Sequence, residues 1–478
     1  MDNLPHIPVL RFGQSYESLD HMDIARHATG EVLARVSTVN AGIIRRDLKK
    51  IETARAALKK LSIARLIEIC SRTGEEFLNG TLPLGDKGHT QSPEDYIRTL
   101  SSTSGLPHVM AKRNMSKIHY ALTNMMTVLN GLTRGMDLSI LDTGIGEVNG
   151  ARCCFYPSGK ALGLVMPSNS PAVNSLWLTA IPLRYPVVLK PGREEPWTPF
   201  RLIQAFIKAG APAEAFGFYP TDHDGAAEIL NNCGRALIFG DQNTTARYAG
   251  NSGVQVHGPG FSKILIGEDC IENWRDYIDL MVASVGENGG RSCINASAIV
   301  VPKHGREIAE ALAEKLGPVA PTASDDEDAR LSGFANAKMA EWIDGAIEDD
   351  LKGGGAEDVA VKHRGGPRKA IFEGGVYLRP TVVHCDSPAH PLYNREFLFP
   401  YVSVVEVPQI EMLDKIGPSL VVTAITNDER MRGQLMESPL IDRLNFGPVP
   451  TIKISWDQPH EGNMFEFLYK RRSIEIAG

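Results

Sequence analysis

The sequence lacks the features that mark extracellular, membrane-spanning or nucleic-acid-binding proteins. It has no C-x-x-C pair, and its seven cysteines are scattered apart from the neighbours Cys153 and Cys154, so neither a zinc ribbon nor a disulfide framework is predicted. No run approaches the ~20 apolar residues that span a bilayer. With 50 basic and 57 acidic residues, the net charge of −7 leaves no broad basic surface for nucleic acid or anionic membranes.

The first residues, 1–14, contain no cluster of basic residues and no apolar signal core. An odd number of scattered cysteines fits a reducing compartment, so we expect a cytoplasmic protein. The 43% hydrophobic and 22% charged residues are ordinary for folded domains and exclude disorder, a fibrous repeat or a coiled coil. At roughly 100–200 residues per unit, 478 residues predict about three folded units.

Hydrophobic periodicity divides the chain into segments. Residues 8–37 alternate as short strands do, and residues 41–78 and 117–132 repeat apolar positions at helical spacing. The polar stretch 80–104 between them is predicted to be a loop or insertion.

Two blocks with alternating strands and helices follow. In the first, strands are expected at 161–166, 187–190, 216–219 and 236–239, with a helix at 200–208. In the second, strands are expected at 264–266, 298–301, 402–407 and 421–425, with helices at 277–285, 306–316 and 338–351. This alternation predicts an α/β fold with two parallel sheets, joined near 256–260. Ligands of such sheets bind at the carboxyl ends of strands.

One cysteine stands where a sharp turn can expose it. Cys293 follows the run Glu287-Asn-Gly-Gly-Arg-Ser, between a predicted helix and a predicted strand. A thiol at such a turn can act as a nucleophile if its thiolate is favoured. A small buried hydrophobic cysteine is the alternative reading.

Three further polar residues stand at the ends of, or just before, predicted strands. Asn169 lies between Pro167 and Pro171, where its amide could donate to a developing oxyanion or could belong to a turn. Lys190 ends a strand and could bind a ribose or phosphate, or face solvent. Glu396 precedes a strand and could equally be a surface acid.

Taken together and in this order, these segments resemble the sequence motifs of the aldehyde dehydrogenase superfamily, and the resemblance covers residues 8–475. Met166-Pro-Ser-Asn169-Ser-Pro resembles the family's Pro-Trp-Asn-x-Pro segment, and Gly290-Arg-Ser-Cys293 resembles its Gly-Gln-x-Cys. Further family motifs are similar to four other segments: Lys190-Pro, Gly240 after a strand, Gly375-Val-Tyr-Leu-Arg-Pro-Thr, and Glu396 before Phe-Leu-Phe-Pro. The resemblance implies that Cys293 is the nucleophile and Asn169 the oxyanion donor.

The same resemblance implies a nicotinamide cofactor, NAD or NADP, and no metal. The residues it assigns to the cofactor are Met166, Ser168, Lys190, Arg193, Gly240 and Glu396. Lys190 would reach the adenosine ribose and Glu396 the nicotinamide ribose. Arg193 occupies a position where the family has an acid that favours an unphosphorylated ribose, so we expect NADP to be accepted at least as well as NAD.

The sequence departs from the family at the general base. His257-Gly-Pro-Gly stands in place of Glu-Leu-Gly-Gly, whose Glu activates the water that hydrolyses the thioester. His257 could replace that base, could have no chemical role, or Glu287 could serve instead. Ser168, Asp241 and Phe399 also replace the family's usual Trp, Ser and Gly.

These departures leave three hypotheses open. The first is NAD(P)-dependent oxidation of an aldehyde to a carboxylic acid through a thioester on Cys293. The second is transfer of the acyl group to coenzyme A, or the reverse reduction of an acyl-CoA, because coenzyme-A-dependent members also lack the Glu. The third is a non-catalytic family member.

The resemblance also implies a domain organisation of the aldehyde dehydrogenase type. Residues 1–133 and 157–256 would form the dinucleotide-binding domain, and residues 257–447 the catalytic domain. Residues 134–156 and 448–478 would form a small β extension that joins subunits into a homodimer or homotetramer.

Overall fold

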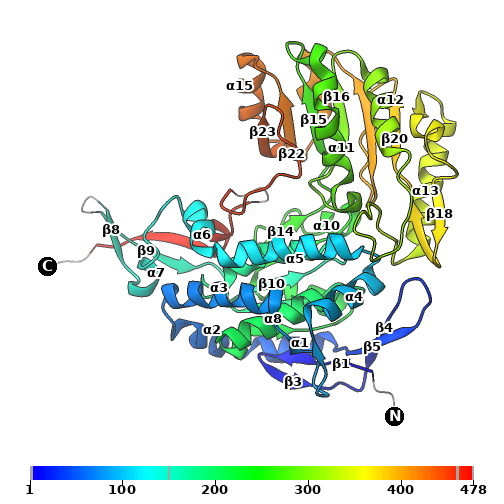
Figure 1. Cartoon of the computed structure of the whole chain (residues 1–478). Helices are drawn as coiled ribbons and strands as arrows, with labels where there is room; N and C mark the ends of the chain where they lie inside the picture. The colour runs from blue at the N-terminus through cyan, green and yellow to red at the C-terminus, as the bar shows by residue number, and fades with distance from the viewer. Residues whose placement is uncertain (1–3, 149–150, 459–461, 476–478) are drawn as a thin grey trace.

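A computed structural model describes residues 4–148, 151–458 and 462–475. Two seven-stranded sheets dominate it, one in each half of the molecule (Figure 1). Within the described residues, no helix is both long and apolar enough to cross a membrane.

The first sheet contains the strands expected in the first alternating block. Its order is β14-β13-β10-β11-β12-β2-β3, and the first five strands are parallel. The bounds are β14 Val254–His257, β13 Gly234–Phe239, β10 Ala161–Val165, β11 Val187–Lys190 and β12 Phe216–Phe218, then the antiparallel hairpin β2 Val9–Arg11 and β3 Gln14–Tyr16.

Alternate residues of these strands pack against helices on opposite faces. Leu162 and Leu164 of β10 belong to a large core with α3, α5 and α8, whereas Ala161 lies in a smaller core with α1 and α9. The helices are α1 Ala41–Leu48, α2 Ile51–Lys59, α3 Ile63–Asn79, α5 His108–Thr123, α6 Met125–Thr133, α8 Trp197–Ala209, α9 His223–Asn232 and α10 Gln242–Ala246. This is the doubly covered sheet that the alternation predicts.

The prediction of a loop over 80–104 is wrong, because helix α4 spans Pro93–Ser104. Ser92 and Asp95 form a capping box and Pro93 opens the helix, so the polar residues that suggested a loop are the helix's start signal. Tyr96 and Leu100 then bury the inner face. Between residues 80 and 92, the chain forms the short antiparallel pair of β6 Leu82–Pro83 and β7 Thr90–Gln91.

The second sheet has the order β17-β20-β21-β16-β15-β22-β23, parallel except at β17. Its strands are β17 Ala356–Asp358, β20 Thr381–Cys385, β21 Tyr401–Glu406, β16 Ala296–Val301, β15 Ser262–Ile266, β22 Ser419–Ile425 and β23 Ile441–Phe446. Helices α11 Ile278–Gly286 and α12 Gly305–Leu316 pack on one face, and α13 Ala337–Lys352, α14 Met412–Ile416 and α15 Glu429–Glu437 on the other.

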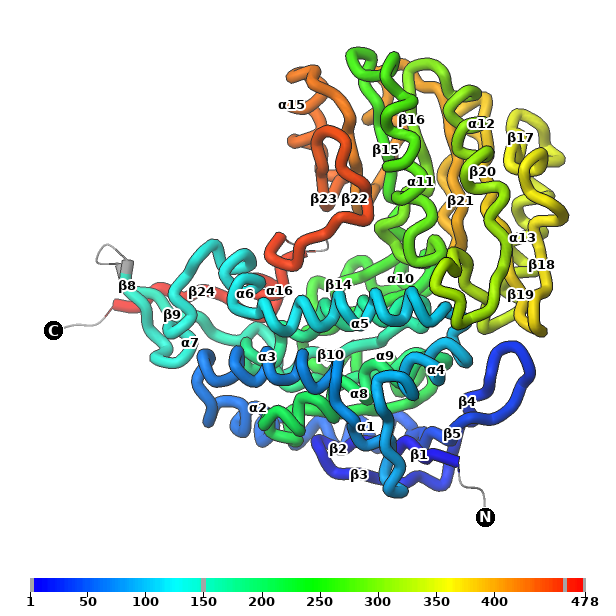
Figure 2. The backbone as a smooth tube through the Cα atoms, viewed as in Figure 1, coloured from blue at the N-terminus to red at the C-terminus, as the bar shows by residue number. Residues whose placement is uncertain are grey.

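A third, small sheet extends away from both halves on the left of Figure 2. Its order is β24-β9-β8, formed by β24 Tyr469–Ser473, β9 Ala151–Pro157 and β8 Gly146–Val148. Helices α7 Ile140–Thr143 and α16 Met464–Leu468 flank it, and a separate sheet, β1-β5-β4, joins His6–Ile7, Val32–Ser37 and His21–Ala25. The hairpin of β18 Lys369–Phe372 and β19 Gly375–Leu378 completes the described strands. Two parallel-sheet units with a small β extension confirm the predicted fold class.

Candidate active site

The loop that carries Cys293 is folded by three consecutive left-handed residues. Between α11 and β16, Asn288, Gly289 and Gly290 have φ values of 54°, 66° and 69°. A Cβ on Gly290 would lie 2.4 Å from the backbone of both Phe399 and Pro400. Glycine is therefore required there, both for its backbone conformation and for the close approach of the segment that follows Glu396.

Cys293 is half-buried at the end of this loop. Its carbonyl accepts a hydrogen bond from Ser262 Oγ at 2.8 Å. A Cβ on Gly260 would lie 2.1 Å from the same carbonyl oxygen, so the linker between the two sheets passes directly against Cys293. The thiol thus stands where the two parallel sheets meet.

Asn169 lies beside this loop. It follows β10, and its Nδ2 donates to the carbonyl of Arg291, two residues before Cys293, at 2.8 Å. Its Oδ1 is buried and accepts no hydrogen bond. Arg291 is itself held by a bond from Nη1 to Ser104 O at 2.8 Å, and burial lowers its pKa to about 10. The structure therefore brings Asn169 and the Cys293 loop together.

A buried polar network fixes the same two segments. Asn114 of α5 accepts from Ser170 Oγ at 3.0 Å and donates to Asn288 Oδ1 at 2.8 Å. Asn288 Nδ2 in turn donates to Ser292 Oγ at 3.2 Å. Because these groups satisfy one another away from water, they hold the Asn169 segment and the cysteine loop in one arrangement.

The residues assigned to the cofactor, except Glu396, lie at the carboxyl ends of β10, β11 and β13. Met166 is buried under this edge, and Ser168 Oγ accepts from the backbone N–H of Glu194 at 3.3 Å. A Cβ on Gly192 would lie 2.4 Å from Ser168 Oγ, so the loop after Lys190 is pressed against the Asn169 segment. Lys190 is half-buried, and burial lowers its pKa.

Gly240 follows β13 and starts the turn into α10. Asp241 caps that short helix through a 2.8 Å bond from Thr244 N–H to its carboxylate, which lowers the pKa of Asp241. An exposed carboxylate therefore occupies the turn where the family has a Ser. Arg193 is exposed on the neighbouring loop and supplies a cation to the same edge of the sheet.

Glu396 belongs to the second sheet's half of the molecule, in the segment before β21. Its Oε2 accepts the backbone N–H of Phe261 at 2.6 Å, and Phe261 O accepts from Lys263 Nζ at 2.7 Å. Burial lowers the pKa of Lys263 to about 7, against the opposing effect of the nearby Glu396. Sequence reasoning missed Lys263, although a lysine inside the apolar strand Ser262–Ile266 was a visible signal.

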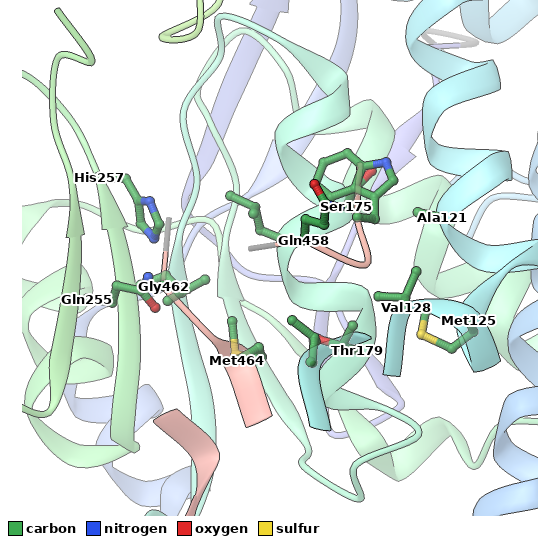
Figure 3. A pocket seen from close by; sticks show the side chains of 14 residues that line it. Ala121, Met125, Val128, Ser175, Thr179, Gln255, His257, Gln458, Gly462 and Met464 are labelled. Carbon is green, nitrogen blue, oxygen red and sulfur yellow. The ribbon is translucent and has the colours of Figure 1, made fainter. Parts of the chain in front are cut away.

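His257 ends β14, with its ring stacked on that of Phe239, the centroids 4.5 Å apart. Figure 3 shows it on one side of a small cavity of about 50 Å³. Ser175 and Thr179 line the same cavity, and their buried hydroxyls make no hydrogen bond with the protein. The linker places His257 three residues from Gly260, which touches Cys293.

Glu287, the other candidate base, is engaged elsewhere. Its carboxylate lies 3.6 Å from Arg113 Nη1 and 3.9 Å from Lys117 Nζ, both on α5. Burial lowers the pKa of Lys117, and Glu287 opposes that effect. This pairing favours a structural role at the start of the cysteine loop.

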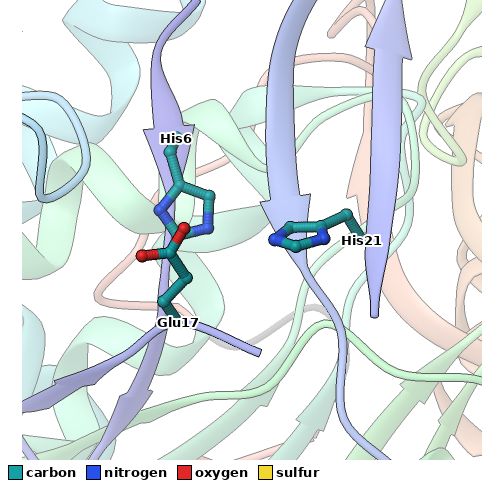
Figure 4. Close-up of side chains that lie close together, drawn as sticks. All are labelled: His6, Glu17 and His21. Atoms are coloured by element: carbon teal, nitrogen blue, oxygen red, sulfur yellow. The ribbon is translucent and has the colours of Figure 1, made fainter. Parts of the chain in front are cut away.

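One group of side chains has the composition of a metal site but not the free ligand atoms. His6, Glu17 and His21 lie close together in the first half of the chain (Figure 4). Both ring nitrogens of His6 are used, by Asp86 Oδ1 at 2.7 Å and Ser37 Oγ at 2.9 Å. Glu17 pairs with Lys87 at 2.6 Å. A metal ion would have to displace these bonds.

Comparison with known structures supports the fold. An indole-3-acetaldehyde dehydrogenase complexed with NAD⁺ superposes with a TM-score of 0.80 and 16% identity, covering 99% of this chain and 97% of that one. A glyceraldehyde-3-phosphate dehydrogenase of Methanocaldococcus jannaschii complexed with NADP gives 0.76 and 14%, covering 96% and 99%.

Comparison of sequences identifies the family. A protein of Staphylococcus haemolyticus, provisionally named an aldehyde dehydrogenase, is 22% identical over 414 residues, 84% of this chain and 81% of that relative. The model of the aldehyde dehydrogenase family matches residues 14–416, which include Asn169, Cys293 and Glu396. The chain therefore belongs to the aldehyde dehydrogenase family and is an oxidoreductase that acts on aldehydes.

Proposed function

We propose that the chain oxidises an aldehyde to a carboxylic acid through a thioester on Cys293, with NAD or NADP as hydride acceptor. The observation that carries this proposal is the bond between Asn169 Nδ2 and the carbonyl of Arg291, two residues from Cys293. This bond supports the proposal because it holds an amide donor against the loop that carries the half-buried Cys293.

The chain's own residues supply the acylation step. The Cys293 thiolate adds to the aldehyde carbon, which turns the carbonyl oxygen into an oxyanion. Asn169 Nδ2 and the backbone N–H of Cys293 are the donors for that oxygen. To act, Asn169 exchanges its bond with Arg291 O for one with the oxyanion, and the network around Asn114 holds its segment in place.

The edge formed by β10, β11 and β13 fits a dinucleotide. Lys190 keeps N–H donors there, since its described bond is a long one of 3.4 Å to the adjacent Pro191 carbonyl. Lys190, Ser168 and Gly240 would hold the adenosine half and Glu396 the nicotinamide ribose. When bound, the cofactor accepts the hydride. Solved relatives in complex with NAD⁺ and with NADP support this choice of cofactor.

Water is the proposed acyl acceptor, with His257 as the base. An imidazole is the side chain most often used as a general base to take a proton from water. The small cavity beside His257 carries two buried hydroxyls, of Ser175 and Thr179, that can hold a water molecule next to the imidazole. Coenzyme A remains the second candidate because the family's Glu is absent. The third hypothesis, a non-catalytic member, is set aside because the chain belongs to a family of oxidoreductases that act on aldehydes.

The organisation predicted from the sequence is proposed unchanged. Residues 1–133 and 157–256 form the dinucleotide domain, 257–447 the catalytic domain, and 134–156 with 448–478 the joining segments. The exposed edges of the β24-β9-β8 sheet support assembly of a homodimer or homotetramer, in the cytoplasm.

Replacement of Cys293 by Ala tests the proposal. Turnover of aldehydes with NAD(P) should disappear, because no thiohemiacetal can form. The matched control is Cys153→Ala, which removes another half-buried thiol outside the site. Products are analysed with and without coenzyme A. A Cys293→Ala variant that retains more than a few per cent of the wild-type rate would contradict the mechanism, and an acyl-CoA product would replace water as acceptor.

A further inference from the structure

Lys263 is a buried basic side chain that the proposed reaction does not use. It lies on the interior strand β15, between β16 and β22, with its side chain fully buried. Its Nζ donates to Phe261 O at 2.7 Å and to Ser419 Oγ at 3.2 Å. Both acceptors are neutral, so they compensate only part of the cost of burying an ammonium group. The carboxylate that acts on it electrostatically is Glu396.

The peptide of Phe261 is held from both sides. Its N–H donates to Glu396 Oε2 at 2.6 Å, and its carbonyl accepts from Lys263. Phe261 has φ of 46°, a left-handed conformation that is unfavourable for a bulky non-glycine residue. Such a conformation persists only where its surroundings enforce it, and the hydrogen bonds to Glu396 and Lys263 do so here.

The same turn touches the nucleophile. Gly260 and Ser262, on either side of Phe261, contact the carbonyl of Cys293. The carbonyl of Gly260 accepts from Leu420 N–H at 2.7 Å, which ties the turn to β22. A shift of the Phe261 peptide would therefore move Glu396 and the wall of the Cys293 loop together.

We propose that Lys263 is a positioning residue that, through the Phe261 peptide, sets the orientation of the Glu396 carboxylate for the cofactor. This inference rests on the proposed role of Glu396 at the nicotinamide ribose. Lys263 fixes the carbonyl of Phe261, the fixed peptide aims its N–H at one oxygen of Glu396, and the carboxylate keeps a single rotamer.

The test uses Lys263→Met, which keeps the length of the side chain but removes the charge and its donors. The affinity for NAD and NADP, measured by calorimetry, should fall about 10- to 100-fold, the range for losing a hydrogen bond to a charged group. Lys263→Met combined with Glu396→Gln should be no worse than the more damaging single variant, because both act on one element. Hydrogen exchange of the Phe261 amide without cofactor should speed up.

Thr423→Val is the matched control, since Thr423 is a buried hydroxyl on β22 that does not contact this turn. It should leave cofactor affinity and exchange at Phe261 unchanged. Unchanged affinity in Lys263→Met, or effects that multiply in the double variant, would overturn the inference. If Lys263→Met does not fold, Ser419→Ala carries the test: a smaller loss in the same direction supports the inference and no loss overturns it. A wild-type protein that binds cofactor but oxidises no aldehyde would refute the proposed function alone.

Discussion

Replacing Asn169 with Ala should separate catalysis from stability. The change removes the Nδ2 donor proposed for the oxyanion, and one such donor is worth about 2.7–4 kcal/mol, or ~10²–10³ in rate. It also deletes the 2.8 Å bond to Arg291 O, whose net contribution to folding is about 0.5–1.5 kcal/mol. The loss is partly offset, because the buried Oδ1 that accepts no hydrogen bond is deleted at the same time. The free energy of unfolding should therefore fall by about 1 kcal/mol or less.

The assay is a stopped-flow measurement of NAD(P)H formation in the first turnover, together with urea unfolding. The acylation rate of Asn169→Ala should drop ~10²–10³-fold with little change in cofactor affinity. Asn169→Asp is the matched variant, since it keeps the shape but cannot donate when ionised, and its carboxylate would face Arg291 O. Acylation within about tenfold of wild type in a folded Asn169→Ala protein would refute the oxyanion role. Loss of cofactor binding instead would assign Asn169 to the structure of the cofactor edge.

Three further predictions concern deacylation, cofactor choice and pH. If His257 activates water, His257→Ala should show a burst followed by slow turnover while the acyl-enzyme accumulates. If coenzyme A is the acceptor, His257→Ala should change turnover little and added coenzyme A should yield a thioester. Fast hydrolysis by His257→Ala that does not respond to coenzyme A would reject both versions. Arg193→Glu should weaken NADP binding more than NAD binding, measured side by side at one salt concentration, and a strong wild-type preference for NAD would disprove the role of Arg193. Burial raises the pKa of Glu195 from 4.5 to about 8, so the folded state binds this proton more tightly than the unfolded state does. The resulting contribution to the free energy of unfolding is complete below pH about 4.5 and is lost as the pH rises to about 8. Relative to Glu195→Gln, wild type should therefore lose up to about 5 kcal/mol of unfolding free energy across that window, and parallel pH profiles would contradict this.

The regular elements and the main site residues could be predicted because their signals are local. Strand β11 is a short apolar run ended by Lys190-Pro, and the two glycines before Cys293 indicate a turn whatever the rest of the chain does. Asn169 stands between prolines, which fixes its backbone. Their roles were inferred from resemblance, and they remain predictions.

The features that could not be predicted from the sequence depend on contacts between distant segments. Helix α4 looked like a loop because its capping residues are polar, and the burial of Tyr96 is decided by tertiary packing. The role proposed for Lys263 depends on Glu396, which is far away in the sequence and acts on it only in the folded chain. The stack of His257 on Phe239 requires the pairing of β13 with β14. No local pattern in the sequence encodes such neighbours.

The small sheet β24-β9-β8 has a consequence for the order in which the protein folds during its synthesis. β9 pairs with β24, so residues 151–157 cannot form the hydrogen bonds of this pairing until residues 469–473 have been synthesised. Tyr185 and Ser158 likewise donate to the carbonyl of Leu468. On the ribosome, the contiguous second sheet can be complete while the first half of the chain still exposes an unpaired strand edge. That interval, rather than the finished enzyme, is where aggregation is to be expected.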